Sequence, residues 1–337
     1  MEMRIDFHTH IIPEEIPNFV EKYGSQKWPV LKKTCSCGAD IYLEGEKFRE
    51  VTDQVWSAEK RIEDMDKEGV DMQVLSPIPL TFSYWAKSEE AEDFSQLQND
   101  FISNIIKEYP SRFLGLGTVP LQDADAAIRE MKRCKFELGL HGLEIGTNVN
   151  GLNLDEPYLD EFFAKAEEWQ VPLFIHPWES LGLERMPRHN FMYTISYTTD
   201  TTLAAASLVN GGVMEKYPKL KICLAHGGGT YPWLLPRFDQ GYNVWPHLRE
   251  ISNPPSYYAK KFYVDSLVYD SKNLQFLIDT FGEEKIFMGS DYPFLLREIN
   301  PGKVIDDSKE LNEETRKGIL GLNVLEFLNI NIEDVKK

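Results

Sequence analysis

The segment Ile5-Asp6-Phe7-His8-Thr9-His10 opens the chain with an apolar run that ends in two histidines. Side chains alternate along a strand, so His8 and His10 are expected on one face, where their imidazoles converge. Such a pair can be half of a metal site, and it can equally be a polar face of a strand. The residues that follow the later strands decide between these two interpretations.

Seven further strand-like segments follow, and amphipathic stretches lie between them. The eight apolar segments are Met3–His8, Asp71–Ser76, Phe113–Val119, Gly142–Gly146, Pro172–His176, Lys221–His226, Phe262–Ser266 and Lys285–Gly289. The expected helices are Ala58–Glu68, Ser95–Tyr109, Ala124–Leu138, Leu159–Trp169, Thr201–Tyr217, Ser271–Phe281 and Glu313–Leu328. This alternation predicts an α/β fold, a (β/α)8 TIM barrel. A doubly wound open sheet is the alternative, and no Gly-x-Gly-x-x-Gly opens a first helix to favour it.

The first strand-to-helix connection is much longer than the others. Roughly forty-five residues separate His10 from the first helix, far beyond a normal βα loop. The segment carries Trp28, Tyr42 and Phe48, which a mere linker would not need. We therefore expect a single domain over residues 1–337, with residues 14–52 as a small inserted subdomain over the barrel mouth.

Composition excludes several classes of function. The chain of 337 residues has a net charge of −18, and no basic stripe could bind nucleic acid. No signal peptide or membrane-spanning apolar run is evident, which predicts a cytoplasmic protein without a membrane partner. Four cysteines do not indicate a disulfide framework in a chain of this length. We interpret Cys35-Ser-Cys37 as incidental, since no second Cys or His pair completes a zinc ribbon.

Side chains that can bind a metal follow four of the expected strands. The first strand ends in His8 and His10, the fifth in His176, the sixth in His226, and the eighth in Asp291. Function collects at the carboxyl ends of barrel strands, so we expect these side chains to meet at one mouth.

Three imidazoles and a carboxylate suit Zn²⁺ and leave room for a water ligand. The metal would lower the pKa of that water towards about 7. One of the four histidines is expected to stay off the metal and transfer protons, and the spacing does not decide which one. We interpret Gly227–Gly229 as a place of close backbone approach at the metal rather than as a phosphate cradle.

Several stretches along essentially the whole chain resemble one enzyme family. The motifs similar to the amidohydrolase superfamily are His8-Thr-His10, His176-Pro-Trp178, His226-Gly-Gly-Gly229 and Gly289-Ser-Asp291-Tyr-Pro-Phe294. Those that resemble its narrower 2-amino-3-carboxymuconate-6-semialdehyde decarboxylase family are Phe82-Ser-Tyr-Trp-Ala-Lys87, Arg112-Phe-Leu-Gly-Leu-Gly-Thr118, Gly211-Gly-Val213 and Pro218-Lys-Leu-Lys221.

This resemblance implies a metal-dependent decarboxylase that uses neither oxygen nor an organic cofactor. One Zn²⁺ per chain, with Mn²⁺ as an alternative, would be held by His8, His10, His176 and Asp291. His226 would transfer protons beside a zinc-bound water, and in one interpretation it helps that water add to the substrate before the C–C bond breaks. The resemblance also implies a small carboxylated substrate, namely the semialdehyde or a close analogue, and a homodimer.

The resemblance also assigns residues to the pocket. Arg49 of the insertion would bind a substrate carboxylate, while Trp178 and Phe294 would shape the wall.

Two positions depart from the family pattern. Trp245 stands where the family has a second substrate arginine, offered across the dimer interface, and Tyr193 stands where it has a pocket tryptophan. Arg237 or Arg249 could replace that arginine. A tryptophan at position 245 would favour a flatter, less charged substrate, for instance an aromatic acid.

Other interpretations stay open. One is a non-oxidative hydroxybenzoate decarboxylase, in which the metal is Mn²⁺ and Asp291 delivers a proton to the ring. Another is a hydrolase of amides, esters or lactones with a single metal ion, since Gly142-Leu-Glu-Ile-Gly146 has no lysine to bridge two metals and Glu144 lies too deep in the strand. A non-catalytic binding protein is least favoured. Asp265 is expected to support a metal-site histidine.

Overall fold

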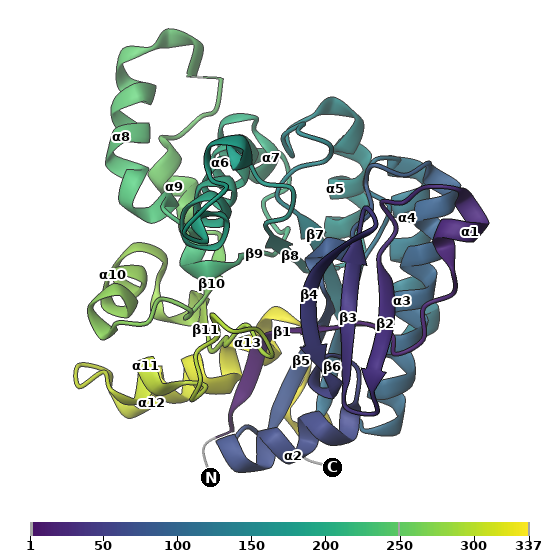
Figure 1. Cartoon of the computed structure of the whole chain (residues 1–337). Coiled ribbons are helices and arrows are strands. Elements are labelled where there is room, and N and C mark those ends of the chain that lie inside the picture. Colours follow the sequence, from purple (N-terminus) through teal and green to yellow (C-terminus); the bar gives the residue numbers. More distant parts are fainter. Residues whose placement is uncertain (1–2, 249, 336–337) are drawn as a thin grey trace.

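A computed structural model describes residues 3–248 and 250–335 of the chain (Figure 1). Within these residues, eight parallel strands form one sheet in the order β1-β5-β6-β7-β8-β9-β10-β11. Their bounds are Ile5–Ile11, Met72–Pro77, Phe113–Gly117, Gly142–Gly146, Leu173–His176, Ile222–Leu224, Tyr263–Asp265 and Ile286–Phe287. Helices connect strands that are neighbours both in sequence and in the sheet. The (β/α)8 barrel is confirmed.

Backbone hydrogen bonds bring the last strand of the sheet beside the first. The amide of Phe7 donates to the carbonyl of Met288 at 2.9 Å, and the amide of Asp291 donates to that of His8 at 2.8 Å. Thr9 forms a parallel bridge with Tyr292. The segments that carry His8 and Asp291 are therefore neighbours.

An irregularity in β1 turns successive side chains toward the barrel interior. The pairing of β1 with β5 shifts between Asp6 and Thr9. As a result Phe7 and His8, although adjacent in sequence, both contact the ring of Phe174, with ring centroids 5.0 and 4.9 Å away. A regular strand would place them on opposite faces.

Aromatic rings fill the barrel beneath the histidines. Phe7 contacts three further rings, with centroid separations of 5.0 Å to Phe174, 5.0 Å to Phe287 and 5.6 Å to Phe327. All four side chains are buried. Burial stabilises the fold by about 1.5–3 kcal/mol for each such ring. The histidines thus lie against a layer of closely packed aromatic side chains.

Helices cover the outer face of the sheet (Figure 1). Their bounds are α1 Phe19–Tyr23, α2 Ala58–Glu68, α3 Ser88–Glu108, α4 Ala124–Arg133, α5 Asp160–Glu168, α6 Tyr197–Asn210, α7 Val213–Lys216, α8 Tyr231–Val244, α9 Pro255–Ala259, α10 Ser271–Phe281, α11 Lys303–Asp306, α12 Glu313–Lys317, α13 Asn323–Phe327 and α14 Ile332–Val335. Among the described residues, no helix has both the length and the apolar character needed to cross a membrane.

Most expected helices are present, with shifted ends. The predictions for α2 and α10 match, whereas α3 begins at Ser88 instead of Ser95. Helix α8 was not expected, because Pro232 lies in its first turn and Pro236 lies inside it. The expected helix over 201–217 is divided into α6 and α7 at Gly212, which has φ +81°.

The long connection after β1 contains a second, antiparallel sheet. Its strands are β2 Val30–Cys35, β3 Gly38–Leu43 and β4 Glu46–Thr52, in the order β2-β3-β4. Ile41 of β3 packs in one cluster with Ile12 and Trp56, and Trp28 packs with Phe94 of α3. The inserted sheet therefore rests on the barrel. The division into one domain with an inserted subdomain stays a prediction.

Candidate metal centre

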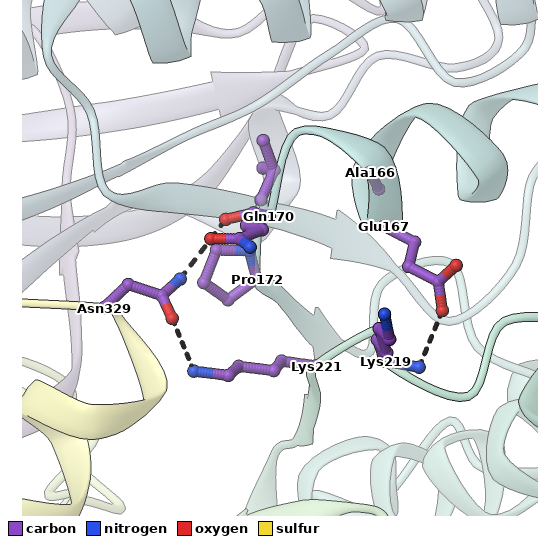
Figure 2. Close-up of a pocket in the computed structure, with 8 residues that line it drawn as sticks. Ala166, Glu167, Gln170, Pro172, Lys219, Lys221 and Asn329 are labelled. Atoms are coloured by element: carbon purple, nitrogen blue, oxygen red, sulfur yellow. Dashed lines mark hydrogen bonds between the residues drawn. The ribbon is translucent and has the colours of Figure 1, made fainter.

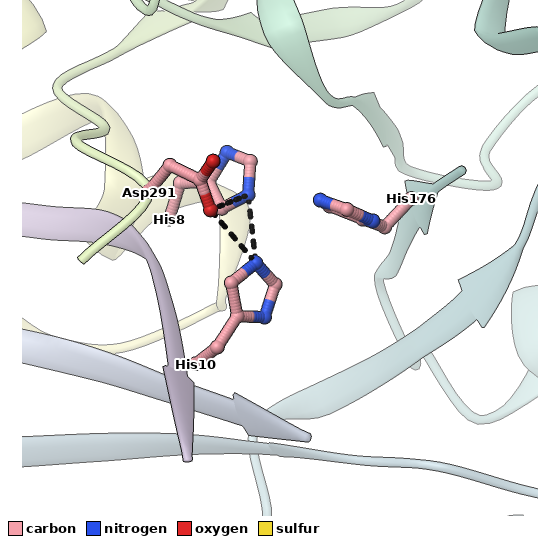
Figure 3. A group of neighbouring side chains, drawn as sticks. All are labelled: His8, His10, His176 and Asp291. Carbon is pink, nitrogen blue, oxygen red and sulfur yellow. Dashed lines mark hydrogen bonds and ion pairs between the residues drawn. The ribbon is translucent and has the colours of Figure 1, made fainter. Parts of the chain in front are cut away.

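Four side chains from three separate segments meet at the carboxyl ends of the strands (Figure 3). His8 and His10 lie on β1, His176 ends β8, and Asp291 follows β11. One ligand atom from each lies within 4.8 Å of the others. Within residues 3–248 and 250–335, this is the one group of three or more His, Cys, Asp or Glu side chains close enough to hold a metal ion.

Each of these histidines has a partner on its Nδ1 atom. Nδ1 of His8 lies 2.8 Å from a carboxylate oxygen of Asp265. Nδ1 of His10 and Nδ1 of His176 each lie 3.0 Å from a proline carbonyl oxygen. Carbonyl oxygens can only accept hydrogen bonds, so these Nδ1 atoms donate and the Nε2 atoms carry lone pairs. Burial lowers the pKa of His10 and, much further, that of His176, which keeps both rings neutral.

The Nε2 atoms face a common space. Those of His8 and His10 are 3.0 Å apart, and Nε2 of His176 is buried with no hydrogen-bond partner among the described residues. Lone pairs at this distance repel one another unless a cation lies between them. Oδ1 of Asp291 lies 3.3 Å from Nε2 of His10 and 3.7 Å from that of His8. Neutral imidazoles and a carboxylate are the donors that such a cation requires, so the residues fit a metal ion.

Asp265, at the end of β10, joins this cluster to the loop after β9. Its Oδ2 accepts hydrogen bonds from Nδ1 of His8 and from the amide of His226, both at 2.8 Å. Its Oδ1 accepts from the amides of Gly227 at 2.8 Å and Leu267 at 3.1 Å. Burial lowers the pKa of His8, but the hydrogen bond to Asp265 and nearby carboxylates raise it more. Asp265 thus holds a histidine of the cluster, as expected, and the binding of metal by that histidine stays a prediction.

The glycines after His226 allow the backbone to turn there. Gly227, Gly228 and Gly229 have φ values of +62°, +76° and +64°. A Cβ on Gly227 would lie 2.6 Å from the side chain of Val268, and one on Gly229 would clash with the carbonyl of Thr198 in α6. These glycines thus approach neighbouring segments closely, and the expected close approach at the metal stays a prediction.

The ring of His226 lies beside the cluster without belonging to the four-ligand group. Its centroid is 5.2 Å from that of His8 and 5.0 Å from that of His176. Burial lowers its pKa to about 4, so the ring is neutral near pH 7. Its Nδ1 is buried with no hydrogen-bond partner among the described residues. An uncharged imidazole beside a metal site is suited to accept and return a proton.

Arg49 reaches the same mouth from β4 of the inserted sheet. Its Nη2 donates a hydrogen bond to the hydroxyl of Tyr193 at 2.7 Å. Its guanidinium carbon lies 4.6 Å from the ring centroid of Phe294, whose own centroid is 5.5 Å from that of His10. Trp178 and Phe294 each pack against the buried cluster that contains Ile41 of the inserted sheet. The structure thus brings Arg49, Tyr193 and Phe294 together at the mouth that holds the metal cluster, and their contact with substrate stays a prediction.

The sequence reasoning missed Tyr197. Its ring centroid lies 6.4 Å from that of His226, nearly parallel to it, and 5.4 Å from that of Tyr193. Tyr193 and Tyr197 are four residues apart, a spacing that places two side chains on one face of a helix. That spacing is the signal in the sequence that could have identified it.

Arg237 and Trp245 lie elsewhere in the described chain. Both belong to α8 or its end, at the upper left of Figure 1, and line a hollow of about 240 Å³ with Phe238 and Gly241. Trp245 is 56% exposed. Their predicted contact with substrate stays a prediction, and Arg249 lies outside the described residues.

Another hollow, of about 210 Å³, lies at the opposite end of the barrel (Figure 2). It is bordered by Pro172 and Lys221, which immediately precede β8 and β9. Nζ of Lys221 donates to Asn329 at 2.7 Å and also to two backbone carbonyls. Its ammonium is thus already bound by the protein, and no reactive group identified in the sequence lies there.

Glu144 is fully buried on β7. Its Oε1 lies 3.6 Å from Nδ1 of His10, on the side of that ring opposite Nε2. Burial raises the pKa of this carboxyl well above its ordinary value. A neutral acid behind the ligand ring is not placed to bridge two metals, in agreement with a site for a single ion.

Comparisons with known proteins agree with this geometry. A family model described as Amidohydrolase matches residues 5–330. The chain is 44% identical over 331 residues to 2-amino-3-carboxymuconate-6-semialdehyde decarboxylase of Dictyostelium discoideum, covering 98% of this chain and 92% of that protein. It is 31% identical over 380 residues to the enzyme of the same name from Caenorhabditis elegans, covering 97% and 94%.

A solved structure shows the same fold. Dihydroxybenzoic acid decarboxylase from Polaromonas sp. JS666, with bound manganese and the inhibitor 2-nitroresorcinol, superposes with a TM-score of 0.79 at 21% identity over 99% of each chain. The family match spans the barrel from β1 to beyond α13. The chain therefore belongs to the amidohydrolase family, in the branch of the 2-amino-3-carboxymuconate-6-semialdehyde decarboxylases.

Proposed function

We propose that this protein is a metal-dependent decarboxylase of 2-amino-3-carboxymuconate-6-semialdehyde or a close analogue. The observation that carries the proposal is the convergence of three histidines and Asp291 at the mouth where the guanidinium of Arg49 lies against Phe294. The names of the relatives from Dictyostelium discoideum and Caenorhabditis elegans support the choice of substrate.

We propose one Zn²⁺ per chain, held by His8, His10, His176 and Asp291. Three imidazoles and one carboxylate suit zinc, and Mn²⁺ is the alternative, supported by the manganese in the Polaromonas structure. When bound, the metal supplies Lewis acidity, which stabilises negative charge on a coordinated oxygen and lowers the pKa of a bound water. Elemental analysis of the purified protein distinguishes the two metals.

His226 is the proposed proton-transferring residue. The carboxylate leaves as CO₂, its electron pair stays on the carbon that carried it, and that carbon must take up a proton. A neutral ring has one bare nitrogen to accept a proton and can return it to carbon later in the reaction. The low pKa of His226 keeps it in this uncharged form near pH 7.

Arg49 is the proposed carboxylate-binding residue. One of its N–H groups is donated to Tyr193, which leaves others free for a substrate carboxylate. The rings of Phe294 and Trp178 form the proposed wall beside it. Because Tyr193 orients the guanidinium, this tyrosine acts on binding through Arg49.

The proposed activity is tested with a panel that contains the semialdehyde, several hydroxybenzoates, an ester and a lactone, and CO₂ release and hydrolysis are both measured. We expect release from the semialdehyde, abolished by a chelator and restored by Zn²⁺. Release from a hydroxybenzoate alone would favour the hydroxybenzoate decarboxylase, and hydrolysis of an ester or lactone without CO₂ would refute both.

Two variants test the roles of the residues. His226→Asn should retain the metal and lose at least 100-fold in kcat, within the range of general acid–base catalysis. His189→Asn, at an exposed histidine, is its matched control. Arg49→Ala should raise KM for a carboxylated substrate at least tenfold, whereas Lys47→Ala on the same strand should not. Unchanged kinetics in either test variant would remove that residue from the site.

We also propose a homodimer in the cytoplasm. Trp245 and Arg237 border a hollow on α8, and the family resemblance implies that the residue at position 245 is offered across the dimer interface. Light scattering measures the oligomeric state. If mixed His226→Asn and Trp245→Ala subunits regain activity, residue 245 acts across the interface. Cell fractionation tests the location.

A further inference from the structure

The pair Cys35 and Cys37 lies at the turn between β2 and β3, outside the proposed catalytic machinery. The two Sγ atoms are 3.1 Å apart, and both residues are exposed. The sequence alone indicated an incidental pair, because no second Cys or His pair completes a zinc ribbon. We propose that Cys35 and Cys37 form a redox-active dithiol that closes reversibly to a disulfide within one chain.

The hairpin holds the two sulfurs in place. Cys35 ends β2 and pairs with Gly38, which begins β3, so the turn itself is only Ser36 and Cys37. The carbonyl of Cys37 accepts a hydrogen bond from the amide of Asp53 at 3.1 Å, which ties the turn to the chain after β4. A Cβ on Gly38 would lie 3.2 Å from Sγ of Cys35. A glycine there leaves space for the thiol.

The separation of the sulfurs favours a disulfide over a metal chelate. Sulfurs bonded to each other are about 2.05 Å apart, so the pair must close by about 1 Å. Two thiolates on a tetrahedral metal with bonds of about 2.3 Å would lie about 3.8 Å apart. In the described part of the chain, these cysteines also have no third ligand close enough to complete a metal-binding group.

The two thiols are chemically unequal. Hydrogen bonds from the thiol and the amide of Cys37 lower the pKa of Cys35, and the hydroxyl of Thr34 contributes in the same direction. The same contact raises the pKa of Cys37. Since the thiolate is the attacking form, Cys35 is assigned as the nucleophile and Cys37 as the resolving thiol.

A low-molecular-weight disulfide, such as glutathione disulfide, is the oxidant. The Cys35 thiolate attacks one sulfur, the disulfide bond breaks, and one glutathione thiolate leaves. Cys37 then gives its proton to that thiolate and attacks the sulfur of Cys35, which releases the second glutathione. Two protein thiols are oxidised and one disulfide is reduced to two thiols, so atoms and electrons balance.

The full-length protein is equilibrated with mixtures of reduced and oxidised glutathione. Free thiols are then blocked, and the intact mass and unreduced peptides are measured. We expect the mass of a single chain, not covalently linked to another, that has lost two hydrogens, and an unreduced peptide with a Cys35–Cys37 disulfide. Cys134 and Cys223, only 2% and 0% exposed, serve as internal controls and should remain free thiols.

Two variants test the assigned order of attack. Cys37→Ser should stop at one glutathione on Cys35, because the resolving thiol is absent. Cys35→Ser should take up glutathione at least tenfold more slowly, because the thiol of higher pKa remains. Both positions are exposed, so these variants should fold.

Three results would overturn the proposal. They are both thiols remaining free in glutathione disulfide alone, one glutathione staying on each cysteine, or a disulfide between two chains. The measurement counts thiols and masses, so it does not depend on decarboxylase activity.

Discussion

Asp265→Asn should weaken metal binding without touching any of the four proposed ligands. In the native structure, one carboxylate accepts four hydrogen bonds, two at each oxygen. An asparagine has the same shape but one amide group in place of an oxygen. That group cannot accept, so the two donors that face it lose their partner in either orientation.

The consequence for the metal depends on which oxygen is replaced. An amide group at the position of Oδ2 would face Nδ1 of His8 and the amide of His226, donor against donor. His8 would then move its proton to Nε2 and lose its lone pair for the metal. Removal of the hydrogen-bond partner of a metal-ligating histidine lowers metal affinity about 10–100-fold, which corresponds to about 1.4–2.7 kcal/mol. Two lost hydrogen bonds to an ionised group should lower the free energy of unfolding by about 3–6 kcal/mol.

Two assays separate these effects. Competition with a chromogenic chelator measures metal affinity at a temperature where the variant is folded, and urea unfolding of the metal-free protein measures stability. Asp307→Asn, which removes an exposed ion pair with Lys303, is the control and should change stability by about 1 kcal/mol or less. A metal affinity of Asp265→Asn within threefold of wild type would refute the argument that this carboxylate sets the tautomer of His8.

Three further predictions concern the rim, the response to acid and the glycine turn. Tyr193→Phe removes the 2.7 Å hydrogen bond to Arg49 and should raise KM about 3–10-fold with little change in kcat, measured by steady-state kinetics. Burial lowers the pKa of His141 to about 4, so the unfolded chain binds more protons than the folded chain between about pH 4 and 6.5. The free energy of unfolding therefore falls as the pH falls through this window. His141→Gln should remove about 1–3 kcal/mol of that loss in urea unfolding, and an unchanged dependence of the free energy of unfolding on pH would contradict it. Gly229→Ala should lower the free energy of unfolding by about 2–4 kcal/mol, measured by thermal unfolding, because its Cβ would clash with a backbone carbonyl. The control Gly151→Ala has open space around its Cβ and should lower it by about 1 kcal/mol. Equal decreases in the two variants would argue against the clash.

Much of the barrel could be predicted from the sequence because its signals are local. Buried parallel strands are short apolar runs, and each was recognisable before any pairing was known. His8 and His10 share a face by strand geometry, while His176 and Asp291 could be placed at strand ends by the barrel rule. Helix α8 was missed because its two prolines interrupt the local pattern that a helix prediction depends on.

The pocket residues were harder to predict because they come from loops and from the insertion. Arg49 was assigned through family resemblance, and only the packing of β4 over the barrel places it against Phe294. Tyr197 carries no motif and is recognised by its contact with the ring of His226. Trp245 directly follows α8, a helix that was not expected, and lines one hollow with Arg237.

The sequence by itself determined the order of strands and helices, the residues able to bind a metal, and the strand ends that carry them. Periodicity and residue chemistry act over a few residues and can be seen in one dimension. The tertiary structure decided which nitrogen of each histidine faces the site, because that depends on partners such as Asp265 and two proline carbonyls supplied by other segments. It also brought the sulfurs of Cys35 and Cys37 within 3.1 Å, since hairpin pairing, not sequence spacing, directs their side chains.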